Sequence, residues 1–510
     1  MRIDDIKLRL GEDKARLKKI AEDKMRGHCG YLKILKKSLD ARNKSDIRWV
    51  YSIEAEKKKP DEKPRELPRT KHPEKRIFVV GSGPAGLFCA IRLIGHGFRP
   101  VILERGEAVE ARVLRIKEFS ENKVLDENSN VQFGEGGAGT FSDGKLNTQT
   151  KDPLNREVLE TFIRFGAPQE IAYLNKPHVG SDRLREVLKN MRAYIQENGG
   201  KFLFETRFSD IRIRDQKVYA IDTVNVRTGE KNTFGADALV LAIGHSSRDT
   251  FCLLKDRGFA LEARKFAVGV RIEHLQAKIN LAQYSASHNL LPPADYKLVS
   301  HAGARTAFTF CMCPGGYVMP AASERGGVVT NGMSNYARDG INANSALLVQ
   351  IEKEDYFNGD VLSGVEFQRK LEQSAYRAGG ETYAAPIQRA EDFVGGRVSK
   401  HFGEVLPTYS AGTAMCDLNR IFPEYVSCSM KAALTDMDRR LKDFADPDAL
   451  LTGVETRFSS PVRILRGESG ECLQCGGVFP CGEGSGYSGG ITSSAADGIG
   501  TAVKIFEKFA

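Results

Sequence analysis

Three glycines, at positions 81, 83 and 86, have the spacing that points most directly to chemistry. They form a GxGxxG motif that follows a short apolar run at 77–80 and opens a segment with helical spacing. Gly81 would make a tight turn, Gly83 would let the backbone approach a pyrophosphate, and Gly86 would let helix and strand pack closely. The diphosphate would sit on the helix N-terminus, where free N–H groups and the dipole favour an anion. The motif predicts a dinucleotide site in which Glu104, after the next strand, accepts hydrogen bonds from an adenosine ribose.

Two later stretches favour FAD over NAD as the dinucleotide. Residues 237–244 (DALVLAIG) resemble the A-T-G signature of two-dinucleotide-binding-fold flavoproteins, with Ile243 where threonine is usual. Residues 477–484 (GVFPCGEG) resemble the second FAD motif of these proteins, where Glu483, in place of the usual aspartate, would bind the ribityl chain. A last helix is expected from near Thr492. In such folds its N-terminal dipole would stabilise negative charge on a reduced flavin.

Several longer stretches narrow the resemblance to one family. They are VQFGEGGAGTFSDGKL at 131–146, GHSSRDT at 244–250, FCMCPGGY at 310–317 and NGMSNYARDG at 331–340. Together they resemble bacterial FAD-dependent dehydrogenases known mainly as uncharacterised proteins, and the similarity covers essentially the whole chain. The resemblance implies the fold and the cofactor but not the substrate. We expect FAD to be contacted by Gly81, Gly83, Pro84, Ala85, Gly86, Glu104, Arg105, Gly136, Gly137, Gly139, Thr140, Gly244, Gly482, Glu483, Gly489, Gly490 and Ile491.

Three charged or titratable side chains are candidates for catalysis, each with a plainer alternative. Lys145 ends the glycine-rich segment and could polarise the flavin, or it could be a surface residue. His245 follows the strand that resembles the A-T-G element, so it could approach the cofactor or could satisfy a turn. Arg271 and Glu273 alternate along an expected strand, where the arginine could hold a substrate carboxylate or the face could simply be exposed.

The cysteines offer two pairs with redox spacing. Cys472 and Cys475 form a CxxC that could pass electrons to FAD as a redox disulfide, and Cys481 follows within the second FAD motif. Cys311 and Cys313 form a CxC on one face of a strand, and Cys313 is the fourth catalytic candidate. The alternative for both pairs is reduced, buried thiols. A zinc site would need a second CxxC, so we expect no metal.

The elements that must position these residues divide the chain into a small N-terminal unit, a linker and a two-part flavoprotein. The predicted fold class is α/β, with a Rossmann-like FAD-binding domain, an inserted α+β substrate domain and a small N-terminal α/β appendage. Four prolines and almost no apolar residue mark the linker. The expected boundaries are 1–56 for the appendage, 57–75 for the linker, 76–150, 201–250 and 461–510 for the FAD domain, and 151–200 and 251–460 for the substrate or cap domain.

Periodicity gives expectations for individual elements. A period of two predicts a three-stranded meander over 201–234, and residues 266–335 are strand-like and rich in glycine. Helical spacing is expected at 183–197, 342–354 and 430–444.

Composition narrows the class of protein further. The 510 residues are 41% hydrophobic and 28% charged, which excludes a disordered or collagen-like chain. No run of 18 apolar residues and no signal-like N-terminus is present, so we expect no membrane span, and ten cysteines favour a reduced, cytoplasmic protein. Residues 1–76 hold 24 Lys+Arg against 14 Asp+Glu, so the net charge of +9 resides in this segment. The balanced remainder gives no reason to expect nucleic acid.

The leading hypothesis is an FAD-dependent oxidoreductase that moves hydride between flavin N5 and a small organic substrate. An FAD-dependent monooxygenase is one alternative, and an RNA-associated flavoprotein that docks through its basic N-terminal segment is another, with nucleic acid the less favoured partner. No second strand–GxGxxG–helix unit is present, so NAD(P)H, if used, would bind transiently. The oligomeric state is left open.

Overall fold

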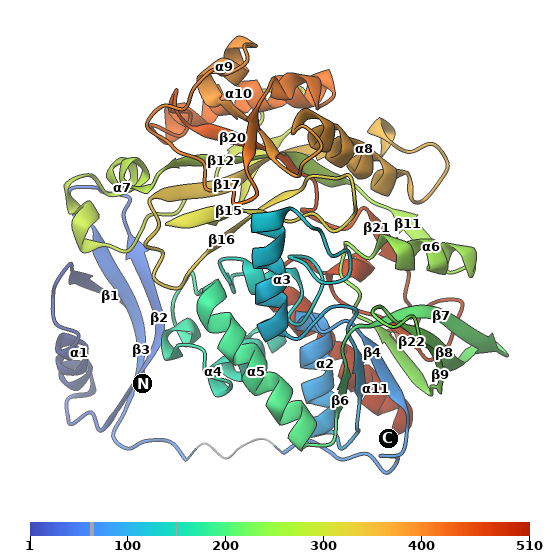
Figure 1. The fold of residues 1–510 in the computed structure, drawn as a ribbon. Helices are drawn as coiled ribbons and strands as arrows, with labels where there is room; N and C mark the ends of the chain where they lie inside the picture. The colour runs from blue at the N-terminus through green and yellow to red at the C-terminus, as the bar shows by residue number, and fades with distance from the viewer. Residues whose placement is uncertain (62–65, 149) are drawn as a thin grey trace.

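The computed structural model describes residues 1–61, 66–148 and 150–510. Figure 1 shows a small N-terminal unit, a domain built on a parallel sheet and a larger cap above that sheet. This is the predicted class: an α/β protein with a Rossmann-like sheet, an α+β insertion and an N-terminal appendage. Of the predicted linker 57–75, residues 62–65 lie outside the described residues, and the described part contains no helix or strand.

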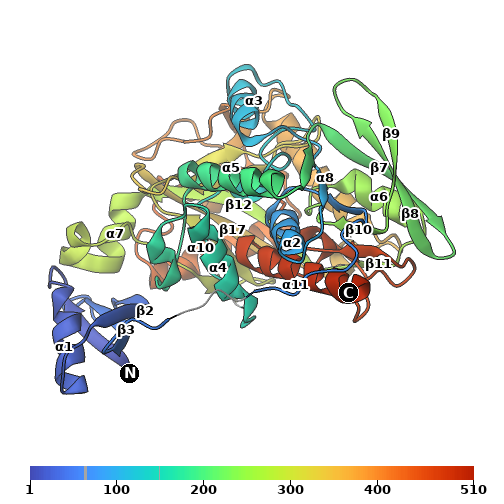
Figure 2. The ribbon, with the colours of Figure 1, turned by 90° about the horizontal axis from the view of Figure 1, so that it is seen from below.

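The N-terminal unit is a three-stranded antiparallel sheet packed against one helix. Its core includes Leu8, Leu17 and Ile53, all buried. The unit contacts the main body through Lys37, whose N–H donates to the Tyr173 carbonyl and whose carbonyl accepts from Asn175. Figure 2 shows the unit at one side of the molecule. Its elements are β1 (Arg2–Arg9), α1 (Ala15–Met25), β2 (Tyr31–Asp40) and β3 (Arg48–Glu56), in the sheet order β1-β3-β2.

Five short parallel strands form the centre of the second domain. Their runs, such as IFVV and ALVL, are apolar throughout because layers cover both faces of the sheet. The strand order is β22-β10-β4-β5-β6, and the strands are β4 (Ile77–Val80), β5 (Val101–Leu103), β6 (Lys201–Leu203), β10 (Ala238–Leu241) and β22 (Val478–Pro480).

The two layers on this sheet differ in kind. Helices share one apolar cluster with one face, and a three-stranded meander and a short helix share another cluster with the opposite face. Segment 151–200, assigned from the sequence to the substrate or cap domain, contributes Val158, Leu184 and Met191 to the helical cluster. The helices are α2 (Pro84–Gly95), α4 (Leu154–Arg164), α5 (Ser181–Glu197) and α11 (Ile491–Phe509); the opposite layer is β7 (Thr206–Arg214), β8 (Lys217–Asn225), β9 (Lys231–Gly235) and α6 (Arg248–Asp256).

The cap is a seven-stranded mixed sheet in the order β13-β14-β17-β12-β20-β18-β19. Helices lie above it, and the hairpin of β15 (Gly316–Pro320) and β16 (Thr330–Ser334) lies on the side of the FAD domain (Figure 1). The strands are β12 (Phe266–Leu275), β13 (Val299–Ser300), β14 (Ala307–Cys313), β17 (Asn342–Ile351), β18 (Ala385–Arg389), β19 (Thr413–Met415) and β20 (Leu450–Glu455), and the helices are α8 (Ser363–Ala378), α9 (Ala390–Gly395) and α10 (Glu424–Arg440). A short antiparallel pair, β11 (Leu261–Ala263) and β21 (Val462–Ile464), joins the domains.

Two expectations about cap elements were wrong. The segment expected to be a helix at 342–354 is strand β17, which lies between β14 and β12. It is buried on both faces along almost its whole length, so no alternation of buried and exposed residues distinguishes this central strand from a buried helix. Within the strand-like stretch 266–335, residues Gln276–Tyr284 form helix α7. The helix expected at 430–444 is present as α10 but begins and ends earlier.

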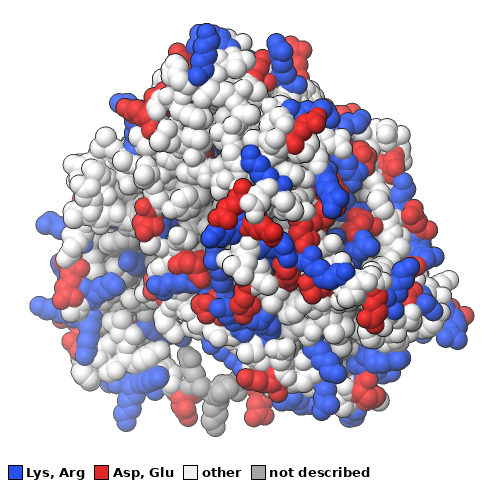
Figure 3. Space-filling model, viewed as in Figure 1, with Lys and Arg blue, Asp and Glu red and all other residues white. Residues whose placement is uncertain are grey.

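The surface shows no dominant sign of charge on the face seen in Figure 3, where basic and acidic side chains alternate over most elements. Within the three described ranges, no helix is both long and apolar enough to cross a membrane.

Candidate FAD site

An open cleft lies at the carboxyl ends of the parallel strands, where ligands bind in sheets of this type. It contains about 990 Å³ of space between the atoms, part of which is open to solvent. Thirteen of the seventeen expected cofactor residues line this cleft, and a fourteenth, Gly489, directly precedes one of them in the chain. The thirteen are Gly81, Gly83, Pro84, Ala85, Glu104, Arg105, Gly137, Gly139, Gly244, Gly482, Glu483, Gly490 and Ile491.

The remaining three expected residues lie behind the wall and shape it. A Cβ on Gly86 would come 1.9 Å from the Gly81 carbonyl oxygen, so only glycine lets α2 approach β4 this closely. A Cβ on Gly136 would meet the Thr140 hydroxyl at 2.2 Å. That hydroxyl donates to the Glu135 carbonyl, which fixes the glycine-rich loop. These residues therefore support the site without facing it.

Two helices begin at this cleft and lie side by side. Gly83 and Pro84 start α2, and Gly490, with a φ of 92°, precedes α11. The helices pack closely because a Cβ on Gly498 would lie 2.2 Å from the Ala85 carbonyl oxygen. Figures 1 and 2 both show α2 and α11 next to one another. Their first N–H groups and dipoles make this end of the cleft favourable for anionic groups.

Glu104 has a larger structural role than the sequence indicated. Its carboxylate accepts from the Ser82 N–H and hydroxyl at 3.0 and 2.7 Å, and from the N–H groups of Gly106 and Gly134 at 2.9 and 3.0 Å. The carboxylate thus ties the GxGxxG turn to the loop at 131–146. It also lines the cleft, where a ribose would have to share it with these donors.

The other end of the cleft is lined by Arg105 and by residues that the motifs did not indicate. The Arg105 guanidinium lies 4.3 Å from the centre of the Phe133 ring and pairs with Asp249 at 2.9 Å. Thr206 and Phe208 of the meander complete this part of the wall. A planar cation over an aromatic ring suits the stacking of a base. These residues come from four separate segments, so no single local motif could reveal that they meet.

His245 has an unsatisfied nitrogen in the wall of the cleft. Its Nδ1 lies 3.5 Å from Glu483 Oε1, while its buried Nε2 has no partner within the described residues. A buried polar atom without a partner is costly unless a ligand or water completes it. The glycine cradle, the paired helix starts and this nitrogen therefore fit a polar dinucleotide such as FAD.

Lys145 does not line the cleft but lies close to its helical end. The Lys145 ammonium is 3.8 Å from Asp143 and has no hydrogen-bond partner within the described residues. Asp143 is held by both arms of Arg338 from the cap, at 2.9 and 2.5 Å. The next residue, Leu146, accepts through its carbonyl from the Thr492 hydroxyl in the first turn of α11. Lys145 is thus neither in the wall nor a freely exposed residue.

Arg271 does not lie on an exposed strand face, and a role in holding a substrate carboxylate stays a prediction. The side chain is fully buried, so it lies neither in the cleft nor on an exposed strand face. It donates to Asn344, to Glu455 at 3.0 Å and to the Cys311 carbonyl at 2.7 Å. Burial raises the pKa of Glu455 to about 7 despite this arginine. Alternation along a strand could not show that hairpin β15–β16 covers this face.

The cysteine pairs lie in different settings. Cys472 and Cys475 are buried free thiols between the sheet and the meander, and burial raises the pKa of Cys475 to about 11. Cys313 is buried, and Cys311 is partly exposed at the end of β14. Cys313 does not line the cleft. Within the described residues, no cluster of His, Cys, Asp and Glu is arranged to hold a metal.

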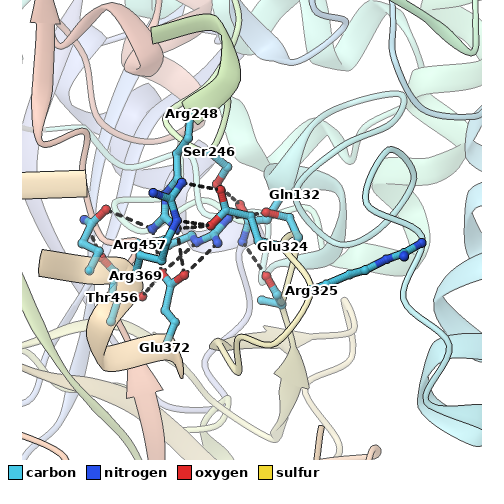
Figure 4. A network of polar contacts seen from close by, with 12 residues as sticks. Gln132, Ser246, Arg248, Glu324, Arg325, Arg369, Glu372, Thr456 and Arg457 are labelled. Atoms are coloured by element: carbon cyan, nitrogen blue, oxygen red, sulfur yellow. Dashed lines mark hydrogen bonds and ion pairs between the residues drawn. The ribbon is translucent and has the colours of Figure 1, made fainter. Parts of the chain in front are cut away.

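A charged network joins the cleft to the cap (Figure 4). Arg248 at the start of α6 donates to both Glu324 and Glu372 of the cap, at 2.6 and 2.8 Å. Arg457 donates to the same Glu372 carboxylate at 3.0 Å. Ser246, which lines the cleft, donates to Gln132 at 3.1 Å. This network fixes the cap relative to the wall of the cleft.

Comparison with known proteins shows which family the chain belongs to. A model described as "FAD-dependent protein, C-terminal domain-like" matches residues 265–458, which is the cap. An uncharacterised protein of Clostridium beijerinckii is 44% identical over 533 residues, covering 100% of this chain and 99% of its own. The chain belongs to the family of that relative, and its cap matches the C-terminal domain of FAD-dependent proteins.

Solved structures are similar only at a low level. A glycerol-3-phosphate dehydrogenase from Bacillus halodurans, complexed with FAD, is 12% identical; the match covers 85% of this chain and 64% of that chain, with a TM-score of 0.38. A geranylgeranyl bacteriochlorophyll reductase-like protein from Thermoplasma acidophilum is 12% identical, with 85% and 78% covered and a TM-score of 0.37. Neither says anything about the substrate of this protein.

Proposed function

We propose that this protein is an FAD-dependent oxidoreductase that transfers hydride between flavin N5 and a small organic substrate held beneath the cap. The observation that carries the proposal is the convergence of two helix N-termini, those of α2 and α11, on one glycine-lined cleft. When bound, FAD would supply a hydride acceptor or donor to the site.

The residues of the chain would hold the cofactor through its polar groups. The first N–H groups of α2 would bind the diphosphate, because Gly83 leaves no side chain in the way. Glu483 would bind the ribityl chain, with His245 Nε2 available for a further hydrogen bond. The N-terminus of α11 would favour negative charge at the flavin end.

The cap would form the part of the site that holds the substrate. Hairpin β15–β16 and the loop at 335–340 face the FAD domain, and Arg338 fastens this loop to Asp143. A cap fixed in this way would exclude water from a reacting centre. NADH or NADPH, if it is the reductant, would reach the flavin transiently from this side.

A pair of glycine substitutions tests the cofactor site. Gly83→Leu should abolish or strongly weaken FAD binding, because φ at Gly83 is −71° and the position is open enough for a side chain, which would then occupy the diphosphate position. Gly500→Ala in α11 is the matched control, since a Cβ there meets nothing within 4 Å. We expect purified native protein and Gly500→Ala to be yellow, and Gly83→Leu to be folded but colourless. A native protein that neither retains nor takes up FAD would refute the proposal.

Anaerobic mixing then tests the reaction class. Native protein is mixed with NADH, NADPH and candidate organic hydride donors while flavin absorbance is followed. Bleaching by an organic donor without oxygen would support a dehydrogenase. Turnover that requires oxygen and hydroxylates the substrate would instead indicate a monooxygenase.

A further inference from the structure

The Cys311–Cys313 pair lies at an irregularity in strand β14. The pairing of β14 with β17 shifts between Phe310 and Cys313, so one extra residue is inserted there. Cys311 has a positive φ of 43°, uncommon for a residue other than glycine. At the bulge the Cys313 side chain lies against Cys311, and its sulfur is 3.2 Å from the Cys311 carbonyl oxygen. A side-chain hydrogen bond joins the two thiols.

Charged groups from three other segments surround the pair. Arg271 of β12 contacts the Cys311 carbonyl and lies 3.6 Å from the Cys313 sulfur. Lys145 and Asp143 act on Cys311 from the glycine-rich loop, and Glu455 of β20 lies on the far side of Arg271. Two cations, Lys145 and Arg271, therefore act on the pair and favour negative charge on a sulfur, while Asp143 opposes it.

The two thiols therefore differ in acidity. The hydrogen bond from Cys313, together with Lys145 and Arg271, lowers the pKa of Cys311. Burial and the adjacent Cys311 sulfur raise the pKa of Cys313. One partly exposed thiol of lowered pKa beside one buried thiol is the arrangement of an attacking and a resolving cysteine.

The pair also lies toward the flavin end of the proposed site. Lys145 acts on Cys311, and the adjacent Leu146 is hydrogen-bonded to Thr492 in the first turn of α11. Gly490 and Ile491, at the start of the same helix, line the cleft. Neither cysteine lines the cleft, but these contacts link the pair through residues 145 and 146 to the start of α11.

We propose that Cys311 and Cys313 are a redox-active dithiol that exchanges two electrons with bound FAD and, through partly exposed Cys311, with small thiol or disulfide substrates. In one direction, the Cys311 thiolate and the Cys313 thiol form a disulfide bond, the S–H bond of Cys313 breaks, and FAD takes two electrons and that proton to become FADH⁻. In the other direction the disulfide is reduced. The inference rests on the proposed function only because FAD is the electron acceptor.

Electron counting by anaerobic dithionite titration tests the pair in the air-oxidised, FAD-containing protein. Native protein should consume about four electrons per FAD, two for the flavin and two for the disulfide. Cys311→Ser and, independently, Cys313→Ser should consume about two. Cys472→Ser is the matched control, because its buried thiol belongs to the other pair, and it should still consume about four. Native protein that binds FAD yet takes up only two electrons overturns the dithiol and leaves the proposed function standing.

Alkylation by iodoacetamide at pH 7 tests the same inference without FAD. In the reduced full-length chain, Cys311 should react at least about tenfold faster than exposed Cys252, because an ordinary thiol is only a few per cent ionised at this pH. Lys145→Met should remove part of this advantage. Equal alkylation rates for Cys311 and Cys252 would overturn the inference even if the protein binds no FAD.

Discussion

The glycine-lined cleft and the charged network beneath the cap use opposite means to fix their geometry. In the cleft, the absence of side chains at Gly81, Gly83 and Gly86 lets backbone groups approach each other and a ligand. In the network, Arg248, Glu372 and Arg457 fill a buried space with charged side chains. The three glycines of the cleft lie in one local stretch of sequence. The charged network is assembled from segments that are 85 and 124 residues apart, so only the fold brings it together.

The two regions also differ in the kind of substitution that destabilises them. The glycine turn is sensitive to added atoms, because a Cβ at Gly81 or Gly86 must displace backbone. A buried ion network is sensitive to removed charge, because the remaining partners lose their compensation and stay buried. Each region can be disturbed by a substitution that the other would tolerate.

The largest effect is expected from Glu372→Gln. This change leaves Arg248 and Arg457 buried without their shared carboxylate, and breaking such a pair costs about 3–5 kcal/mol. Urea unfolding measures the loss. Glu366→Gln on the same helix is the control, since that carboxylate is exposed and pairs with Arg369 at the surface, where the cost is about 1 kcal/mol or less. Equal losses for the two variants would show that the network does not stabilise the cap.

The same carboxylate gives the network a dependence on pH. Burial alone would raise the pKa of Glu372, but Arg248 and Arg457 hold it well below its usual range. A carboxyl with a lowered folded pKa stabilises fully above its unfolded pKa of about 4.3 and loses that contribution as the pH falls below it. Native protein should therefore lose stability below about pH 4.3 more steeply than Glu372→Gln. Parallel stability curves for the two proteins would contradict this assignment.

A smaller loss is expected in the cleft from Gly86→Ala. The new Cβ would lie 1.9 Å from the Gly81 carbonyl, so α2 must move away from β4. Overpacking of this kind costs about 1–3 kcal/mol. The FAD content of the purified variant should fall together with its melting temperature. Gly500→Ala should instead be neutral or stabilise by up to about 1 kcal/mol.

The smallest effect is expected where the two regions meet. Ser246→Ala removes the hydrogen bond to Gln132 at the wall of the cleft. A typical buried hydrogen bond contributes about 0.5–1.5 kcal/mol, so stability should change only slightly. FAD affinity, measured by titration of the apoprotein, should fall by less than it does in Gly83→Leu. A larger fall would show that Ser246 contacts the cofactor itself.

The sequence could predict the elements whose signal is local. Strand β4, helix α2 and strand β5 follow from one apolar run and one glycine motif, and α5, α11 and the meander follow from their periodicity. Strand β17 could not be identified, because burial on both faces removes the alternation. Arg271 was misplaced because its setting depends on hairpin β15–β16 and on Glu455, which is distant in sequence. Arg105 could be placed near the cofactor, but its partners Phe133 and Asp249 could not.

The side-by-side packing of α2 and α11 has a consequence for biosynthesis. One helix begins at residue 84 and the other at residue 491, so the ribosome must translate all of the intervening residues before the two can meet. Strand β22, at one edge of the parallel sheet, is translated equally late. The nascent N-terminal part of this domain must wait for its last helix, and insertion of the flavin would follow translation rather than accompany it.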